Sequence, residues 1–203
     1  MGLSPVIAVV GVADASKAAP LARALVAGGV RAIEITLRTP AALEAVRQAA
    51  AVEGAVVGAG TVLNPADFHA AQAAGARFIV SPGLTPELLD CARESGLPYL
   101  PGVATASELM QGLTHGLARF KLFPAEAIGG RTLLRSFAGP FPQVRFCPTG
   151  GITPELVPQY MKLSNVACVG GSWLAPEAML AAGDWSGLER LARDAVSRGS
   201  RPV

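Results

Sequence analysis

The chain alternates between short β-branched runs and helical stretches rich in alanine and leucine, and this alternation repeats eight times. Short apolar runs with β-branched residues predict strands, whereas the longer stretches between them predict helices. The predicted strands cover residues 5–10, 32–36, 56–59, 78–80, 99–100, 118–123, 144–147 and 166–169. The predicted helices begin near Ala15, Pro40, Pro65, Pro86, Thr105, Gly130, Pro154 and Pro176.

Both ends of the predicted helices carry recurring signals. A capping residue followed by proline opens several helices: Thr39-Pro40, Asn64-Pro65, Thr85-Pro86 and Thr153-Pro154. The cap oxygen accepts a hydrogen bond from the first turn, where the N–H that proline lacks would have no partner. A glycine follows several helices, where the left-handed conformation ends a helix: Gly28, Gly75, Gly96 and Gly116. The sequence therefore repeats one order of helix, glycine and strand.

Eight parallel strands with covering helices close most readily into a (β/α)8 TIM barrel, and 203 residues are at the small end for that α/β fold. We expect a single domain that spans residues 1–203. An open doubly wound sheet is the alternative, but no GxGxxG follows the first strand to support dinucleotide binding. In a barrel, functional sites lie at the C-terminal ends of the strands, so the polar residues there are the candidates.

The composition argues against several classes of function. No apolar run reaches the roughly 18 residues of a membrane span, and the first residues lack the charged start and cleavage site of a signal peptide. We therefore expect a cytoplasmic protein. The formal charge is only +2, and no basic cluster alternates with aromatic residues, so nucleic acid is not an expected partner. The cysteines and histidines show neither a disulfide framework nor the spacing of metal ligands.

One of only three lysines, Lys121, lies within the apolar strand predicted at residues 118–123. Burial between Phe120 and Leu122 would disfavour the charged ammonium, and the neutral amine is the form that acts as a nucleophile. A lysine at a strand end whose ammonium reaches solvent is the alternative interpretation.

The strand predicted at residues 32–36 offers this lysine a carboxylate partner. Alternation along the strand places Glu34 and Arg38 on the face opposite Ile33 and Ile35. The apolar face must meet the covering helices, so Glu34 should point into the barrel, as Lys121 does by the same parity. A carboxylate beside a nucleophilic amine is the pair that carbinolamine and imine chemistry needs. A structural ion pair is the alternative.

Two glycine pairs follow the last two predicted strands, at Gly150-Gly151 and at Gly170-Gly171. Glycines let backbone N–H groups approach an anion closely, and the helix N-termini that follow add favourable dipoles. Barrels frequently bind phosphate at this position, although tight turns alone would also explain the glycines. A hydroxyl at Thr61 and a small wall at Pro82 would suit a narrow site for a short keto acid.

Six stretches of the chain together resemble the 2-keto-3-deoxy-6-phosphogluconate (KDPG) aldolase family. They are Glu34-Ile35-Thr36-Leu37-Arg38-Thr39, Gly58-Ala59-Gly60-Thr61-Val62-Leu63, Ser81-Pro82-Gly83, Lys121-Leu122-Phe123-Pro124-Ala125-Glu126, Pro148-Thr149-Gly150-Gly151-Ile152 and Gly170-Gly171-Ser172-Trp173-Leu174. The resemblance runs from the first strand to the last helix, with each motif in the family's order. It implies a class I aldolase that splits KDPG into pyruvate and glyceraldehyde 3-phosphate, with a further activity on 4-hydroxy-2-oxoglutarate (KHG).

The resemblance also implies roles for individual residues. Lys121 matches the Schiff-base lysine of the family, and Glu34 matches its general acid/base. The matches for substrate binding are Arg38 and Thr61 at the pyruvyl carboxylate, Pro82, Phe123 and Thr149 along the pocket, and Gly150, Gly151, Gly171 and Ser172 at the phosphate-binding turns. The family further implies a phosphorylated keto acid as substrate, no metal or other cofactor, and a homotrimer.

Three other functions compete with this interpretation. An aldolase of the same fold could prefer unphosphorylated KHG or the galactonate-derived epimer of KDPG. A barrel could bind phosphosugars without catalysis. A metal-dependent class II aldolase is the third alternative, and the absence of a ligand cluster in the sequence disfavours it.

Overall fold

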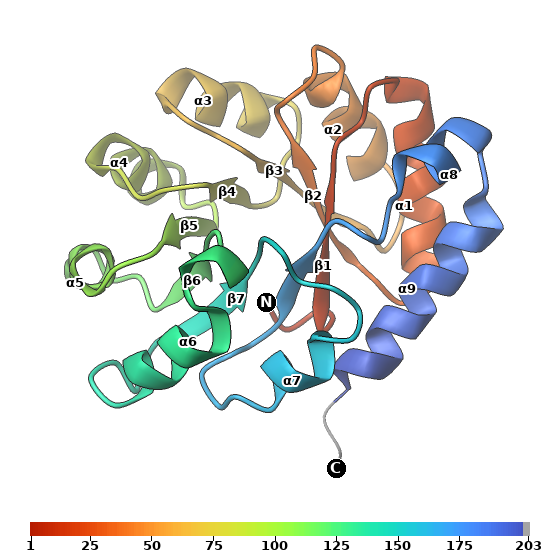
Figure 1. Ribbon diagram of the computed structural model, residues 1–203. Coiled ribbons are helices and arrows are strands. Elements are labelled where there is room, and N and C mark those ends of the chain that lie inside the picture. Colours follow the sequence, from red (N-terminus) through yellow and green to blue (C-terminus); the bar gives the residue numbers. More distant parts are fainter. Residues whose placement is uncertain (201–203) are drawn as a thin grey trace.

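The computed structural model describes residues 1–200, in which eight parallel strands alternate with helices (Figure 1). The strands are β1 (Val6–Val10), β2 (Ala32–Thr36), β3 (Val56–Gly60), β4 (Ile79–Ser81), β5 (Tyr99–Val103), β6 (Arg119–Leu122), β7 (Arg145–Pro148) and β8 (Val169–Gly171). The helices are α1 (Ala18–Ala27), α2 (Ala42–Ala50), α3 (Pro65–Ala73), α4 (Pro86–Ser95), α5 (Ala106–Thr114), α6 (Gly130–Ala138), α7 (Val157–Met161), α8 (Glu177–Ala182) and α9 (Trp185–Gly199). Two short 3₁₀ turns, η1 (Ala15–Lys17) and η2 (Glu126–Ile128), precede α1 and α6.

The strands follow the order β7-β6-β5-β4-β3-β2-β1-β8, so neighbours in sequence are neighbours in the sheet. Two isolated bridges, Phe146 with Val166 and Thr149 with Gly170, bring β7 and β8 together and nearly close the ring. This arrangement confirms the predicted (β/α)8 barrel. The prediction of one domain over residues 1–203 stays a prediction, since residues 201–203 lie outside the described part.

Two strands, β5 and β8, differ from their predicted limits by more than one residue at an end. β5 continues beyond residue 100 to Val103, although Pro101 and Gly102 are residues that usually interrupt a strand. Pro101 pairs with Ser81, and Gly102 pairs with Lys121, so tertiary pairing extends the strand through both. β8 is displaced toward the C-terminus relative to the predicted strand at residues 166–169, because the glycine pair lies within it and not after it.

The helix starts at Pro65 and Pro86 are confirmed with their caps. Asn64 Oδ1 accepts a hydrogen bond from the Asp67 N–H at 2.9 Å, and Thr85 Oγ1 accepts one from the helix that follows. Thr105 caps α5 and shares a reciprocal capping box with Glu108. These contacts satisfy N–H groups that the first turn of a helix leaves without a partner.

The helix starts expected near Pro40 and Pro154 are wrong by two to three residues, since α2 begins at Ala42 and α7 at Val157. The Thr39 hydroxyl donates to the Val12 carbonyl oxygen at 2.5 Å and does not cap a helix. A threonine hydroxyl that binds a neighbouring loop is not available to cap a helix. The Thr39-Pro40 pair therefore does not mark the start of a helix.

Side chains along each strand point alternately out of and into the barrel, so the barrel has an outer and an inner apolar region. Ile33, Ile35, Phe120 and Leu122 face outward and are fully buried between the strands and the ring of helices. Inward-facing residues fill the lower barrel and form a smaller cluster made of Ile7, Ala32, Val80, Leu100, Cys147 and Cys168. The outward set confirms the strand parity on which the predicted placement of Glu34 and Lys121 depends.

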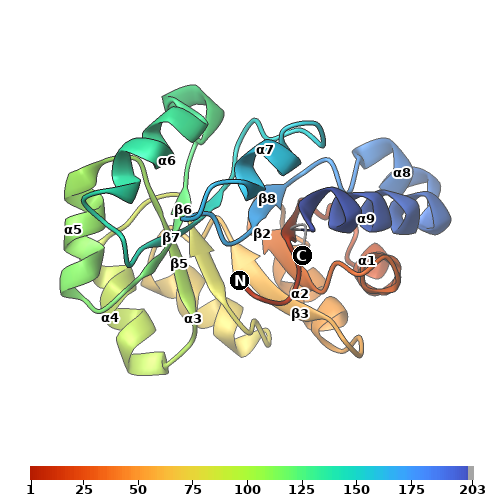
Figure 2. The ribbon, with the colours of Figure 1, turned by 90° about the horizontal axis from the view of Figure 1, so that it is seen from below.

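The last helix, α9, runs beside α1 and covers the side of the barrel where β8 meets β1 (Figures 1 and 2). Gly28, just after α1, allows this contact, because a Cβ there would lie 2.6 Å from the Glu189 carbonyl oxygen of α9. Within residues 1–200, none of the helices combines the length and apolar character needed to cross a membrane.

Candidate active site

A buried ion pair lies at the centre of the barrel. Lys121 Nζ on β6 donates a hydrogen bond to Glu34 Oε1 on β2 over 3.2 Å. The lysine is 6% exposed and the glutamate 2% exposed, so the ammonium does not reach bulk solvent as the alternative interpretation required. The two strands that carry these residues are far apart in the sheet order. Only closure of the sheet brings the two side chains together.

Glycine on the neighbouring strand makes room for the carboxylate. A Cβ on Gly60, at the end of β3, would overlap Glu34 Oε1 and lie 2.6 Å from Glu34 Cγ. Gly60 pairs with Thr36, two residues beyond Glu34 on β2. The sequence motif Gly58-Ala59-Gly60 therefore reflects close packing inside the barrel, and not only a tight turn.

The amine is bordered by an aromatic ring above and by thiols below. Lys121 Nζ lies 5.1 Å from the centroid of the Phe123 ring, a distance at which a ring face attracts a cation. Cys147 pairs with Lys121 across β6 and β7. A hydrogen bond from Cys168, with a further contribution from nearby Lys121, lowers the pKa of Cys147, while the same hydrogen bond raises the pKa of Cys168. All three cysteines are free thiols.

Arg38 and Thr61, which the sequence places on different strands, meet at the mouth of the barrel. Arg38 Nε donates to Thr61 Oγ1 over 3.2 Å, and the Leu37 N–H donates to the Gly60 carbonyl oxygen over 2.8 Å. Thr61 has a φ of 56° and is the one non-glycine residue with positive φ in the described chain. Such a conformation costs energy and is concentrated at functional sites. The arrangement presents a guanidinium and a hydroxyl on one edge of the site.

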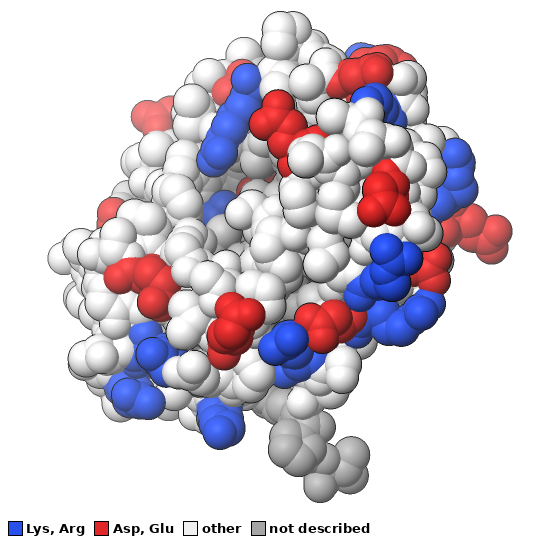
Figure 3. Space-filling view, turned by 45° about the vertical axis from the view of Figure 1, so that its right-hand side comes forward, with Lys and Arg blue, Asp and Glu red and all other residues white. Residues whose placement is uncertain are grey.

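A cavity of about 150 Å³ lies over the C-terminal ends of β1, β7 and β8. It is lined by Val9, Arg38, Phe123, Thr149, Gly150, Gly151, Ile152, Gly170 and Ser172. Most of the predicted binding residues therefore share one small space. Gly150 and Gly151 have φ values of 100° and 79°, which turn the backbone around the edge of this cavity. Figure 3 shows a hollow in the surface, with basic side chains inside it and at its edge.

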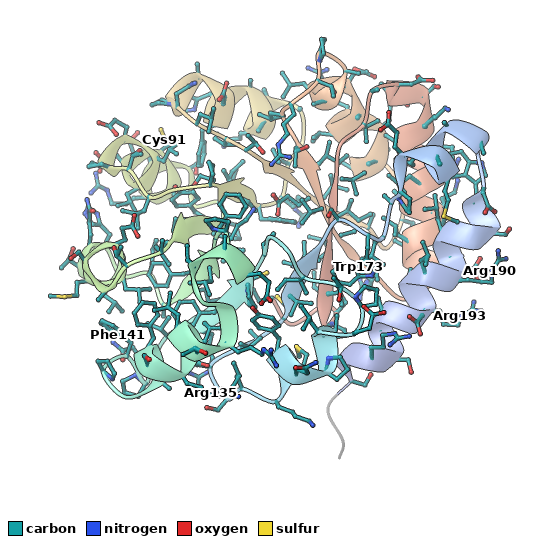
Figure 4. The ribbon with its side chains drawn as sticks, viewed as in Figure 1. Cys91, Arg135, Phe141, Trp173, Arg190 and Arg193 are labelled. Atoms are coloured by element: carbon teal, nitrogen blue, oxygen red, sulfur yellow. The ribbon has the colours of Figure 1, made fainter. Side chains whose placement is uncertain are left out.

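Three predicted binding residues do not line this cavity. Gly171 faces Trp173, which is labelled in Figure 4, and a Cβ on Gly171 would overlap that indole ring. Pro82 lies with its carbonyl against Gly102, the residue that pairs with Lys121. Thr61 is joined to the cavity through its hydrogen bond with Arg38. Pro82 thus borders the amine side of the site, whereas Thr61 contacts a residue of the cavity wall.

Sequence reasoning missed Val9, Ile152 and Gly170 as lining residues. Strand parity could have found Val9, because it pairs with Glu34 and the inward-facing Ile7 lies two residues before it. Gly170 is needed because a Cβ there would overlap Thr149 Oγ1. No local pattern distinguishes Gly170 from Gly171, so only the structure shows which one faces the cavity.

The small cavity shares Val9 and Ser172 with a larger one of about 440 Å³, between the loops that follow β1 and β8. Charged residues at this larger space are Asp14, Lys17 and Glu177. Neither Lys121 nor Glu34 lines these two cavities, but Phe123 lines the smaller one and its ring centroid lies 5.1 Å from Lys121 Nζ. A cavity of about 590 Å³ between α4 and α5 contains none of the predicted site residues.

Among residues 1–200, no group of three or more His, Cys, Asp or Glu side chains is placed to hold a metal ion.

The sequence matches those of known aldolases. A family model described as KDPG and KHG aldolase matches residues 1–191. The KHG/KDPG aldolase of Escherichia coli K12 is 53% identical over 193 residues, which cover 95% of this chain and 91% of that protein. The 2-dehydro-3-deoxy-phosphogluconate aldolase of Zymomonas mobilis is 54% identical over 176 residues, which cover 87% of this chain and 85% of the relative.

Solved structures agree in fold and in sequence. The crystal structure of 2-keto-3-deoxy-6-phospho-gluconate aldolase from Zymomonas mobilis superposes with a TM-score of 0.93 at 50% identity, covering 97% of this chain and 94% of that one. KDPG aldolase from Legionella pneumophila, with pyruvate captured as a covalent carbinolamine intermediate, also gives 0.93, at 47% identity over 96% of this chain and 95% of its own. The chain therefore belongs to the KDPG and KHG aldolase family.

Proposed function

We propose that this protein is a class I aldolase that cleaves KDPG into pyruvate and glyceraldehyde 3-phosphate, with KHG as a second substrate. The observation that carries the proposal is the buried contact between Lys121 Nζ and Glu34 Oε1 at 3.2 Å. Charges inside a barrel are costly to bury, and such groups are concentrated at catalytic sites. The relatives named for both substrates support the assignment.

In the proposed mechanism, Lys121 Nζ attacks the C2 ketone and forms a carbinolamine. Before this attack, Glu34 takes a proton from the Lys121 ammonium, which frees the amine. The attached nitrogen then passes a proton to the alkoxide oxygen, and Glu34 returns its proton as water leaves, which gives the protonated imine. The C3–C4 bond then breaks, its electron pair moves toward the imine nitrogen, and Glu34, directly or through water, takes the proton of the C4 hydroxyl. Glyceraldehyde 3-phosphate leaves, Glu34 returns its proton to C3 of the enamine, and hydrolysis of the resulting imine by water releases pyruvate and restores Lys121. The carbinolamine captured in the Legionella relative supports the first step.

The two ends of the substrate would bind at the two edges of the site. Arg38, held by Thr61, offers a guanidinium for the pyruvyl carboxylate, a pairing that can be bidentate. The turn at Thr149, Gly150 and Gly151, together with Ser172, offers backbone N–H groups and hydroxyls for the phosphate. The cavity at this turn shares Val9 and Ser172 with the larger one, and we place the aldehyde half of the substrate in this region.

A kinetic panel tests substrate choice. KDPG, its C4 epimer and KHG would be compared by kcat/KM, because a working phosphate site should favour the phosphorylated acids over KHG. A clear preference for KHG would instead assign the protein to the unphosphorylated substrate. Phosphosugar binding with no cleavage of any of the three would support the non-catalytic barrel.

We also propose that the reaction needs no metal, that the protein is cytoplasmic and that it forms a homotrimer, as the family resemblance implies. Full activity after dialysis against EDTA would support the first point, and loss of activity restored by a divalent cation would contradict it. Light scattering should give three times the chain mass of 20.7 kDa. A mass of one or two chains would contradict the trimer.

A further inference from the structure

The glycine turn after β7 does not stand alone, because two backbone hydrogen bonds join it to the segment after β6. The Ala125 N–H donates to the Thr149 carbonyl oxygen over 2.8 Å, and the Glu126 N–H donates to the Gly150 carbonyl oxygen over 3.1 Å. A Cβ on Gly151 would lie 2.8 Å from Glu126 Cβ. The position of Glu126 therefore sets the position of the turn.

The Glu126 side chain is itself held by a buried tyrosine. Tyr160, on α7, is 0% exposed, and its hydroxyl donates a hydrogen bond to Glu126 Oε1. A Cβ on Gly130 would overlap the Tyr160 hydroxyl and lie 2.6 Å from Glu126 Oε1, so glycine leaves the space for this contact. Glu126 thus links the turn after β7 to helix α7.

The hydrogen bond from Tyr160 also fixes the direction in which the negatively charged Glu126 carboxylate points. A carboxylate beside a phosphate-binding turn would repel the phosphate if its oxygens pointed at the ligand. Burial and the nearby carboxylate raise the pKa of Tyr160, so the hydroxyl keeps its proton and remains a donor. Arg131, whose guanidinium carbon lies 5.9 Å from the centroid of the Tyr160 ring, places a positive charge on the same side.

We propose that Tyr160 and Glu126 are positioning residues that hold the turn of Thr149, Gly150 and Gly151 in the shape that receives the substrate phosphate. Neither residue touches the reacting carbons. The inference rests on the proposed aldolase function and deepens it, because it assigns discrimination between phosphorylated and unphosphorylated keto acids to a contact beneath the turn. The Tyr160–Glu126 contact should therefore affect KDPG and leave KHG nearly unchanged.

The test is the Tyr160→Phe variant, which keeps the ring and removes the donor. KM for KDPG should rise about tenfold, the equivalent of one lost hydrogen bond to a charged group. kcat for both substrates, and KM for KHG, should stay within about twofold of the wild type, since imine chemistry at Lys121 is untouched. A Glu126→Ala variant should give the same rise, and the double variant should add little to it, because the two residues act through one contact.

Two controls separate positioning from general stability. Tyr99→Phe removes the only other tyrosine hydroxyl in the sequence, which is also buried and bonds Ser81 Oγ over 2.7 Å between β5 and β4. This variant should lose a similar amount of thermal stability without changing the KDPG/KHG ratio of kcat/KM. Glu126→Gln keeps an acceptor for Tyr160 and should retain the wild-type ratio.

The outcomes are distinguishable. If Tyr160→Phe keeps the wild-type ratio, or lowers kcat/KM equally for both substrates, the positioning role is wrong while the aldolase function stands. If the wild-type protein cleaves both substrates without preferring the phosphorylated one, there is no phosphate subsite to shape and the inference falls. If the wild type cleaves neither, the proposed function fails first.

Discussion

Lys121 and Glu34 are 87 positions apart in the chain, yet Lys121 Nζ lies 3.2 Å from Glu34 Oε1 within the barrel. Removing both groups from water is expensive, and a buried ion pair often adds little net stability. A packing role alone would be served as well by apolar residues of similar volume. The pair is better explained by chemistry that needs an amine and a proton carrier in contact.

Replacing Glu34 with glutamine should remove the proton carrier while preserving its size. We expect kcat for KDPG cleavage to fall by a factor on the order of 10²–10⁴, the usual contribution of a positioned acid/base. Steady-state kinetics measures the loss, and circular dichroism shows whether the variant is folded. An unchanged kcat would remove Glu34 from the mechanism.

Gly60→Ala should impair the same step without altering a catalytic group. The new Cβ would overlap Glu34 Oε1, so the carboxylate must move away from Lys121. We expect kcat to fall by about 10²-fold, toward that of the glutamine variant. Gly139→Ala is the matched control, because no atom lies within 4 Å of a Cβ built there. Equal activity of the two alanine variants would show that the close packing does not position Glu34.

Arg38→Ala should weaken binding of the pyruvyl carboxylate and thus affect every substrate alike. Loss of one hydrogen bond between charged groups is worth about 1.5–3 kcal/mol, so KM should rise by roughly ten- to a hundredfold. KDPG and KHG should show the same factor, since both carry this carboxylate. A rise confined to KDPG would instead place Arg38 at the phosphate.

Much of this fold could be read from the sequence, because strand parity and helix caps are local signals. The outward burial of Ile33 and Phe120 confirmed the parity that turned Glu34 and Lys121 toward each other. Features that depend on distant neighbours could not be read in this way. Thr39 binds the loop after β1 and caps no helix, and the contact between Tyr160 and Glu126 joins segments with no shared motif.

Ionisation of Tyr99 should lower the free energy of unfolding at high pH. Burial raises the pKa of Tyr99 to about 12 from an ordinary value of 10.0. The protonated phenol therefore contributes stability that is complete below pH 10 and is lost as the pH rises through 12. A difference of two pKa units corresponds to about 3 kcal/mol in the free energy of unfolding. Chemical denaturation at several pH values should show a larger loss in the wild type than in Tyr99→Phe, which keeps the contribution of Tyr160, and parallel curves for the two proteins would contradict the assignment.

Covalent trapping tests the central claim, that Lys121 forms an imine with the keto acid. Incubation with pyruvate and borohydride should increase the mass of the wild-type chain by one reduced pyruvyl group, and peptide mapping should place it on Lys121. The Lys121→Ala variant should show neither the adduct nor cleavage of KDPG. An adduct on Lys17 or Lys162, or a Lys121→Ala protein with full activity, would contradict the account.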